Sequence, residues 1–129
     1  MTKYVIGPDV AMRLAAERAE VRAELLAPTL IRSHLLTLMF QAVRRGELTR
    51  QDAESALSYV RGLRIRLLGD RVLQHVAWKI ADQLGWDDTF TAEYVALTQL
   101  QADAFITLDK KVARDVRDLV TVAPIGALY

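Results

Sequence analysis

The segment from Ala104 to Arg114 constrains the fold of this chain more than any other part. The apolar run Ala-Phe-Ile ends in Thr-Leu-Asp, and the basic, helix-compatible sequence Lys-Lys-Val-Ala-Arg follows at once. This order predicts a strand over residues 104–108 that leads directly into a helix. Open α/β sheets place their sites at the C-terminal ends of strands, so Asp109 is the first candidate site residue. One carboxylate does little chemistry alone, and its role depends on which other groups converge on it.

The overall composition is that of an ordinary globular protein. A length of 129 residues suits one domain, and hydrophobic residues make up 52% of the chain. We therefore expect a single domain over residues 1–129. The absence of cysteine excludes a disulfide framework and a thiolate metal site, and it suits the reducing cytoplasm, which is the expected location. We expect no signal peptide and no membrane contact, because no run approaches the ~20 apolar residues of a membrane span.

The charge balance does not indicate a nucleic-acid-binding protein by itself. The formal net charge is only +1. Arginine greatly outnumbers lysine, and arginine suits bidentate phosphate contacts. A GC-rich genome also supplies arginine in place of lysine, and we favour this simpler explanation.

Strand-like and helix-like segments alternate along the chain. Strands are predicted over residues 3–6, 25–27, 64–68, 104–108 and 119–122. Helices are predicted over residues 8–21, 28–46, 49–62, 70–85, 92–100 and 110–118, and the fifth of these begins at residues 87–89. This alternation predicts an α/β fold, with a parallel sheet covered by helices.

Several residues predict where these elements begin and end. Thr49 and Asp52 have the spacing of a capping pair, in which the threonine side chain accepts from the backbone of the third helical residue. Asp70 is a good first cap for the next amphipathic helix, and Gly85 is a good stop. Alternation of polar and apolar residues over 64–68 predicts a half-buried or edge strand.

The order of elements and several local sequences resemble a PIN domain, in particular the VapC toxins of bacterial toxin–antitoxin systems. The matching stretches are 4–6, 25–31, 92–97 and 106–113, which cover most of the chain in the right order. The resemblance implies a three-layer sandwich with a central, mostly parallel, twisted sheet of four or five short strands flanked by helices. It also implies a metal-dependent single-strand ribonuclease, in which three or four acidic residues at the sheet edge hold Mg²⁺ or Mn²⁺.

The acidic positions of the family carry over poorly to this chain. Matching by position implies Gly7, His34 and Thr91 at the first three and Asp109 at the fourth. Glycine offers no ligand, threonine offers a neutral hydroxyl, and histidine nitrogen suits Zn²⁺ or Mn²⁺ better than Mg²⁺. We therefore expect a degenerate site with no resident cofactor, and a protein that binds RNA or a protein partner with weak catalysis or none.

A rearranged site is the alternative prediction. Asp9 lies two residues after Gly7, and with Asp109 and His34 it would form a two-carboxylate, one-histidine site for Mg²⁺ or Mn²⁺. The chain would then be an active metal-dependent single-strand endoribonuclease toxin. We favour the simpler roles, in which Asp9 complements the dipole of the following helix and His34 makes a structural hydrogen bond. By the same reasoning, Asp87 or Asp88 is predicted to be a helix cap rather than a metal ligand.

The remaining predictions concern partners. Lys110, Lys111 and Arg114 would attract RNA phosphates, although a solvated helix face is an equally good interpretation. Trp78 and Trp86 would stack on bases, but we favour packing for both. The resemblance implies a homodimer and an antitoxin partner, with contacts on an apolar patch formed by the helices between residues 28 and 62.

Overall fold

A central parallel sheet organises the computed structural model, which describes residues 1–129. Its strands lie in the order β3-β2-β1-β4. All neighbours pair in parallel, and Val5 of β1 lies between Leu26 of β2 and Phe105 of β4. The strand bounds are β1 Lys3–Ile6, β2 Glu24–Pro28, β3 Ile65–Leu68 and β4 Ala104–Ile106.

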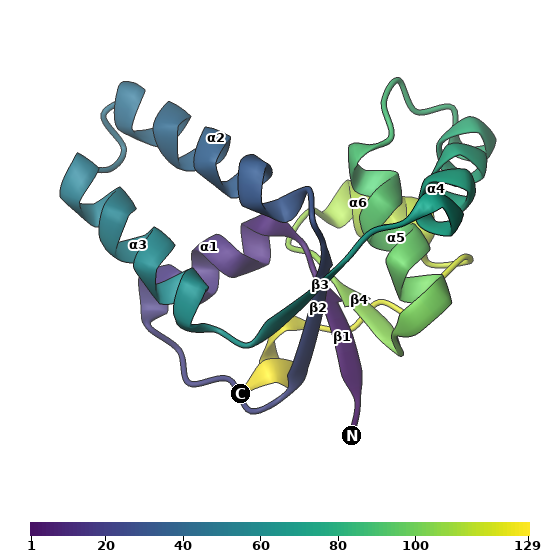
Figure 1. Ribbon diagram of the computed structural model, residues 1–129, viewed down its shortest axis with the longest axis horizontal. Helices are drawn as coiled ribbons and strands as arrows, with labels where there is room; N and C mark the ends of the chain where they lie inside the picture. Colours follow the sequence, from purple (N-terminus) through teal and green to yellow (C-terminus); the bar gives the residue numbers. More distant parts are fainter.

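Helices cover both faces of the sheet, which makes the three layers expected of a PIN-like fold. Figure 1 shows α1, α2 and α3 on one side of the strands and α4, α5 and α6 on the other. The bounds are α1 Pro8–Glu17, α2 Ile31–Arg44, α3 Arg50–Gly62, α4 Arg71–Leu84, α5 Phe90–Gln101 and α6 Lys110–Val116, followed by a short 3₁₀ helix η1 Ile125–Leu128. None of the helices combines the length and the apolar character that crossing a membrane would require.

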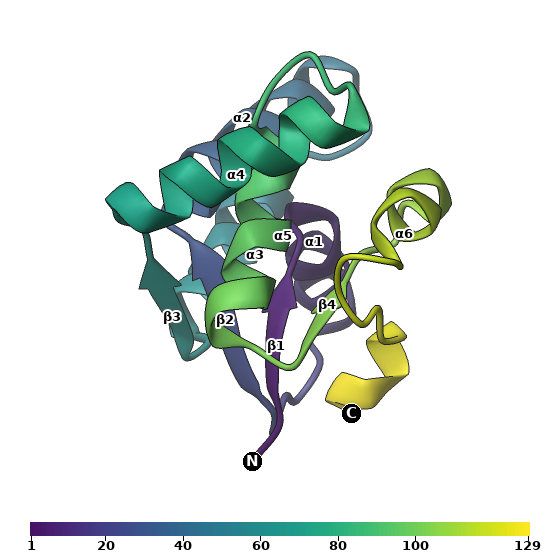
Figure 2. The same ribbon diagram turned by 90° about the vertical axis from the view of Figure 1, so that its right-hand side faces the viewer.

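The core is aliphatic and is centred on β1, β2 and α5. Val5 and Ile6 of β1 are fully buried, as is Leu26 of β2. Helix α5 is apolar on nearly all sides, and Figure 2 shows α4 lying across it on the side away from the strands. A helix of this kind is stable only when it is buried all round. Burial of each large aliphatic side chain contributes roughly 1.5–3 kcal/mol, so α5 is held firmly against the sheet.

The predicted helix ends are largely confirmed. Thr49 accepts from the backbone N–H of Asp52 at 3.0 Å, and the Asp52 side chain completes the capping box. The Asp70 side chain accepts from the backbone N–H of Leu73 at 2.8 Å. Gly85 ends α4 in the left-handed conformation, with φ of 68°. Strand β3 is an edge strand, as the alternation over 64–68 predicted.

The predicted helix over 28–46 is wrong at its start. Pro28 is the last residue of β2 and pairs with Leu68, and α2 begins only at Ile31. Proline favours an extended residue before it, and its missing N–H is tolerated at the end of a strand. Local sequence therefore could not distinguish a strand end from a helix start at this position.

Three other predictions are also corrected. Residues 119–122 form no strand and make only an isolated bridge, between Val122 and Phe105. Helix α1 ends at Glu17 rather than near residue 21, because Arg18 turns to a positive φ of 46°. Trp78 is 70% exposed on the outer face of α4, so it does not pack into the core. Trp86 does pack against the core, as predicted.

Candidate functional site

The C-terminal ends of β1 and β4 meet at the edge of the sheet where a site was predicted. Gly7 follows β1 directly, and its N–H donates to the carbonyl of Ile106 at 3.1 Å. Thr107, Leu108 and Asp109 follow β4 at the same edge. Gly7 is buried and contributes only backbone atoms here.

Asp9 ties these two strand ends together. Its Oδ1 accepts from the N–H of Val10 at 2.8 Å, within the first turn of α1. Its Oδ2 accepts from the N–H of Leu108 at 2.8 Å and from the hydroxyl of Thr107 at 3.2 Å. Both carboxylate oxygens therefore already have donors from the protein. We call this arrangement the Asp9 latch.

Gly7 leaves the space that the Asp9 latch needs. A Cβ atom built on Gly7 would lie 2.6 Å from Oδ1 of Asp9, far inside van der Waals contact. The next nearest atom outside Asp9 is the carbonyl oxygen of Ile106, at an ordinary 3.7 Å. Glycine at position 7 and the folded-back carboxylate at position 9 therefore depend on each other.

Asp109 has a structural partner of its own. Its Oδ1 accepts from the backbone N–H groups of Lys111 at 2.9 Å and of Val112 at 3.1 Å, so it caps α6. Its own N–H donates to the hydroxyl of Thr107 at 3.2 Å. The side chain is exposed to solvent. A capped helix start also favours negative charge through the helix dipole.

His34 lies in an aromatic cluster with Phe90 and Tyr94. Its Nδ1 lies 3.3 Å from the hydroxyl of Tyr94, at hydrogen-bonding distance. The His34 ring centroid is 5.8 Å from that of Phe90 and 6.2 Å from that of Tyr94. Burial raises the pKa of the Tyr94 hydroxyl strongly, and the negative charges of Glu93 and Asp9 raise it further. Tyr94 thus stays protonated and can donate.

The first turn of α5 carries one acidic residue, Glu93, two positions after Thr91. Thr91 is half-buried and offers only a hydroxyl. The ion pairs of the structure join Arg45 to Glu47, Arg50 to Glu54 and Lys111 to Asp115, so Glu93 has no arginine partner. Partial burial raises the pKa of the Glu93 carboxyl.

The capping predicted for the start of α5 is confirmed only in part. Thr89 is the residue before the helix, and its side chain makes no capping bond. Asp88 instead accepts from the N–H of Phe90 at 3.1 Å, two residues away. Asp88 therefore has a role at the helix start, close to the one predicted for it.

The residues at this edge do not fit the divalent cation that a PIN-like fold implies. No three His, Cys, Asp or Glu side chains come together in a way that could hold a metal ion. Mg²⁺ requires several oxygen ligands around one point. Here Gly7 and Thr91 supply no carboxylate, and the oxygens of Asp9 accept from three protein donors. The hydroxyl of Thr107 links Asp9 to the backbone N–H of Asp109, while the Asp109 carboxylate caps α6 and His34 lies beside Tyr94.

The basic residues after Asp109 lie on one short exposed helix. Lys110, Lys111 and Arg114 are all exposed on α6. Lys111 pairs with Asp115 at 3.1 Å, four residues further along the helix. Lys110 and Arg114 make no ion pair, so their charges remain available at the surface.

Two site features escaped the sequence analysis. The partners of Asp9 lie 98 and 99 residues away, so no local pattern indicates them. Tyr94 was noted only as part of the stretch 92–97. It is buried in α5, and its hydroxyl lies at hydrogen-bonding distance from Nδ1 of His34. A tyrosine in the middle of an apolar helix was the available signal, because a buried Tyr hydroxyl normally has a partner.

Comparison with known proteins shows similarity at the level of the fold. No family model matches the sequence, and no curated protein sequence matches it significantly. Among solved structures, PAE2754 from Pyrobaculum aerophilum superposes with a TM-score of 0.78 at 16% identity, covering 98% of this chain and 91% of that one. VapBC2 from Rickettsia felis, solved bound to a DNA fragment from its promoter, superposes with a TM-score of 0.69 at 8% identity, covering 95% and 98%. VapC is a PIN-domain toxin, and the parallel sheet between two helical layers is accordingly a PIN-like fold.

Proposed function

We propose that this PIN-like protein acts by binding and has largely lost the metal-dependent ribonuclease chemistry of the fold. The Asp9 latch is the observation that carries the proposal. Asp9 is the best substitute for the acid missing at position 7, yet its oxygens accept from Val10, Leu108 and Thr107. A hydrogen bond to a charged group is worth about 1.5–3 kcal/mol. These bonds fix the orientation of the Asp9 carboxylate, so any reorientation of Asp9 toward a cation would cost part of this energy.

The surface supports a binding role. Leu36 and Phe40 of α2 are 60% and 63% exposed, and Lys110 and Arg114 of α6 carry unpaired positive charge. Candidate partners are a second copy of the chain, an antitoxin-like protein and single-stranded RNA contacted by Lys110, Lys111 and Arg114. The antitoxin-like partner is suggested by the similarity to the VapBC2 structure. A cytoplasmic location belongs to the same proposal.

Two assays on the purified protein test the loss of catalysis. Incubation with single-stranded RNA in Mg²⁺ or Mn²⁺ should give no more cleavage than the Asp109→Ala variant gives. Isothermal titration calorimetry should detect no saturable binding of either cation. Cleavage at rates typical of nucleases, abolished by Asp109→Ala, would overturn the proposal in favour of an active site built from Asp9, Asp109 and His34.

A gain-of-function variant provides the positive control. Gly7→Asp, His34→Glu and Thr91→Asp together restore an acid at every position that the resemblance assigns to the metal site. The new side chain at position 7 displaces the Asp9 carboxylate, so Asp9→Ala is included to relieve the clash. If the fold has kept the geometry of the edge, this variant should bind Mn²⁺ when the natural sequence does not.

A further inference from the structure

We propose that a pocket at the N-terminal ends of β2 and β3 binds a phosphate monoester group through Arg22 and Arg64. The pocket lies between two connections of the chain, residues 18–23 from α1 to β2 and residues 63–64 from α3 to β3. Because all strands are parallel, these connections lie at the opposite end of the sheet from the Asp9 latch (Figure 1). The inference is independent of the proposed function, since it holds whether or not the protein cleaves RNA.

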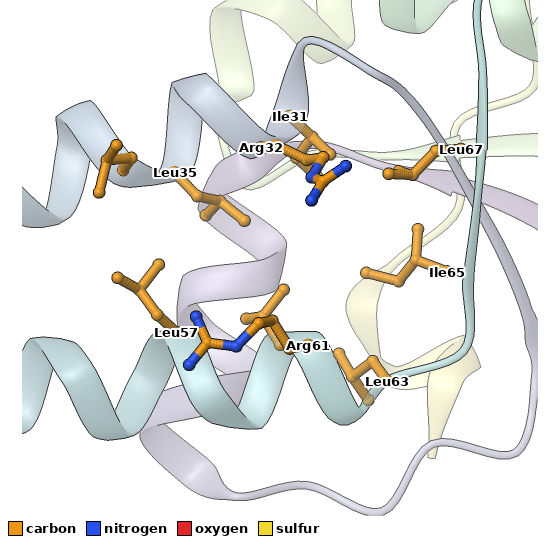
Figure 3. A pocket seen from close by; sticks show the side chains of 10 residues that line it. Ile31, Arg32, Leu35, Leu57, Arg61, Leu63, Ile65 and Leu67 are labelled. Carbon is orange, nitrogen blue, oxygen red and sulfur yellow. The ribbon is translucent and has the colours of Figure 1, made fainter.

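The pocket has room for a phosphate group and a small organic group attached to it. Its volume is about 390 Å³, which lies within the range of small-molecule sites. Four of its seven lining residues are hydrophobic, and the other three are Gly62, Arg22 and Arg64. Figure 3 shows a separate aliphatic groove between α2, α3 and β3, which shares only Leu63 with this pocket.

Contacts within the fold hold the two sides of the pocket together. The hydroxyl of Tyr59 in α3 donates to the carbonyl of Ala19, which ties the connection between α1 and β2 to α3. Leu25 of β2 is almost fully buried and pairs in register with Ile65 of β3, directly after Arg64. The pocket is therefore formed before a ligand arrives, and binding requires little rearrangement of the backbone.

The two arginines of the pocket have no partner within the protein. Neither Arg22 nor Arg64 belongs to any of the ion pairs. The arginine side chains that donate hydrogen bonds within the protein are those of Arg18, Arg45, Arg50 and Arg61. The acidic residues nearest to Arg22 in the sequence, Glu20 and Glu24, neither line the pocket nor pair with either arginine. Two positive charges beside one pocket without a negative charge favour an anion as the ligand.

Backbone donors of the pocket also lack acceptors. The N–H groups of Val21, Arg22, Ala23 and Arg64 donate to no backbone carbonyl. All four residues line the pocket and lie outside the helices and strands. Successive backbone N–H groups and arginine side chains are donors that proteins use for phosphate oxygens. A phosphate monoester carries about −1.5 to −2 charge and three acceptor oxygens, so it can use both guanidinium groups and these N–H groups.

Other ligands suit the pocket less well. Two guanidinium groups repel a metal ion, and a carboxylate has only one negative charge and two oxygens for them. A nucleic-acid strand presents phosphodiesters of single charge, and the pocket contains no aromatic residue on which its bases would stack. A phosphate monoester occurs both in small organic phosphates and at the 5′ end of a nucleic-acid strand, and the experiment separates these two sources.

Isothermal titration calorimetry of the full-length protein with ribose 5-phosphate tests the inference. At about 0.15 M salt, where weak attraction to exposed charges is screened, the ligand should bind saturably at one site. Arg22→Gln/Arg64→Gln should weaken this binding by about tenfold or more, through the lost charge-assisted hydrogen bonds. The affinity of the natural sequence should also fall as pH decreases through about 6, where the phosphate dianion gains a proton.

The matched control is Arg71→Gln/Arg117→Gln. Both arginines are exposed, belong to no ion pair and lie outside the pocket, so this variant loses the same charge and should keep the affinity. Arg22 and Arg64 are likewise exposed, so neither double variant should disturb the fold, which circular dichroism checks. Equal loss of affinity in the two double variants would overturn the inference, because net charge alone would then explain binding.

Tetrauridine with and without a 5′-phosphate distinguishes the sources of the ligand. Binding of only the phosphorylated form, sensitive to Arg22→Gln/Arg64→Gln, would add strand ends to the ligands of the pocket. Binding of ribose 5-phosphate alone would restrict the pocket to small organic phosphates. The inference is overturned if ribose 5-phosphate shows no saturable binding, or if the unphosphorylated strand binds equally well through the same arginines. The RNA-cleavage assay concerns Asp109, so its outcome is separate.

Discussion

The mutual dependence of Gly7 and Asp9 gives the sharpest quantitative prediction. In Gly7→Ala, the new methyl group would meet Oδ1 of Asp9 at 2.6 Å, and the carboxylate must swing away. This movement weakens the bonds that Asp9 accepts from Val10, Leu108 and Thr107. With hydrogen bonds to a charged group at about 1.5–3 kcal/mol each, partial loss of the set costs about 2–3 kcal/mol.

A smaller opposing effect reduces this cost. Replacing glycine by alanine stabilises a protein by roughly 0.4–1 kcal/mol where the native backbone suits alanine. Gly7 has φ of −74° and ψ of 165°, an extended conformation that alanine adopts without strain. The net effect of Gly7→Ala should therefore be a destabilisation of about 1–2.6 kcal/mol, from the difference between these two terms.

The same substitution should change sign when Asp9 is absent. In an Asp9→Ala background the clash disappears, because the nearest remaining atom is the Ile106 carbonyl oxygen at 3.7 Å. Gly7→Ala should then be neutral or stabilising by up to about 1 kcal/mol. The coupling energy of this double-mutant cycle should thus be about 2–3 kcal/mol, which is within the range found for residues in contact.

Urea unfolding followed by circular dichroism measures the four proteins of the cycle. Free energies of unfolding obtained from a common m-value are directly comparable. The reasoning is refuted if Gly7→Ala costs the same in both backgrounds, because Asp9 would then not occupy the space beside Gly7. It is also refuted if Asp9→Ala alone costs nothing.

Three further predictions concern neighbouring residues. Glu93→Gln should stabilise the protein at neutral pH and lose this advantage near pH 4. Burial raises the pKa of Glu93 in the folded state, so the stability of the wild-type protein falls as pH rises through that pKa. Thermal unfolding at both pH values checks this, and an equal advantage at both would contradict it. Asp109→Ala should lower the free energy of unfolding by about 1 kcal/mol through the lost helix cap. Urea unfolding should give the same loss in Mg²⁺ and in EDTA, and a larger loss in Mg²⁺ would show that Asp109 holds a cation. Tyr94→Phe should lower the free energy of unfolding by at most about 1 kcal/mol. It should also shift the imidazole NMR signals of His34, because Nδ1 of His34 lies 3.3 Å from the Tyr94 hydroxyl. Unchanged signals would exclude that contact.

Local patterns in the sequence predict the elements whose signals are themselves local. The apolar runs of β1, β2 and β4 and the caps at Thr49, Asp70 and Gly85 lie where the sequence indicates. Each of these features depends on side chains within a few residues of one another. The position of the sheet edge follows from them, because the C-terminal ends of parallel strands meet on one side.

Long-range contacts explain what the sequence could not predict. Pro28 continues β2 because Leu68 of β3 pairs with it, and residues 119–122 fail to form a strand because they make only one bridge to Phe105. Predicting any of these requires knowing which distant segment lies opposite.

The polar groups at the sheet edge satisfy one another and do not converge on an empty point. Asp9 and Asp109 each accept from two or more donors, His34 lies beside a buried hydroxyl, and no buried polar side-chain atom in the structure lacks a partner. A site that holds a cation needs the opposite arrangement, with several carboxylates facing each other at a cost in repulsion that the ion relieves. No three such side chains come together at this edge, which agrees with the proposal that the protein acts by binding.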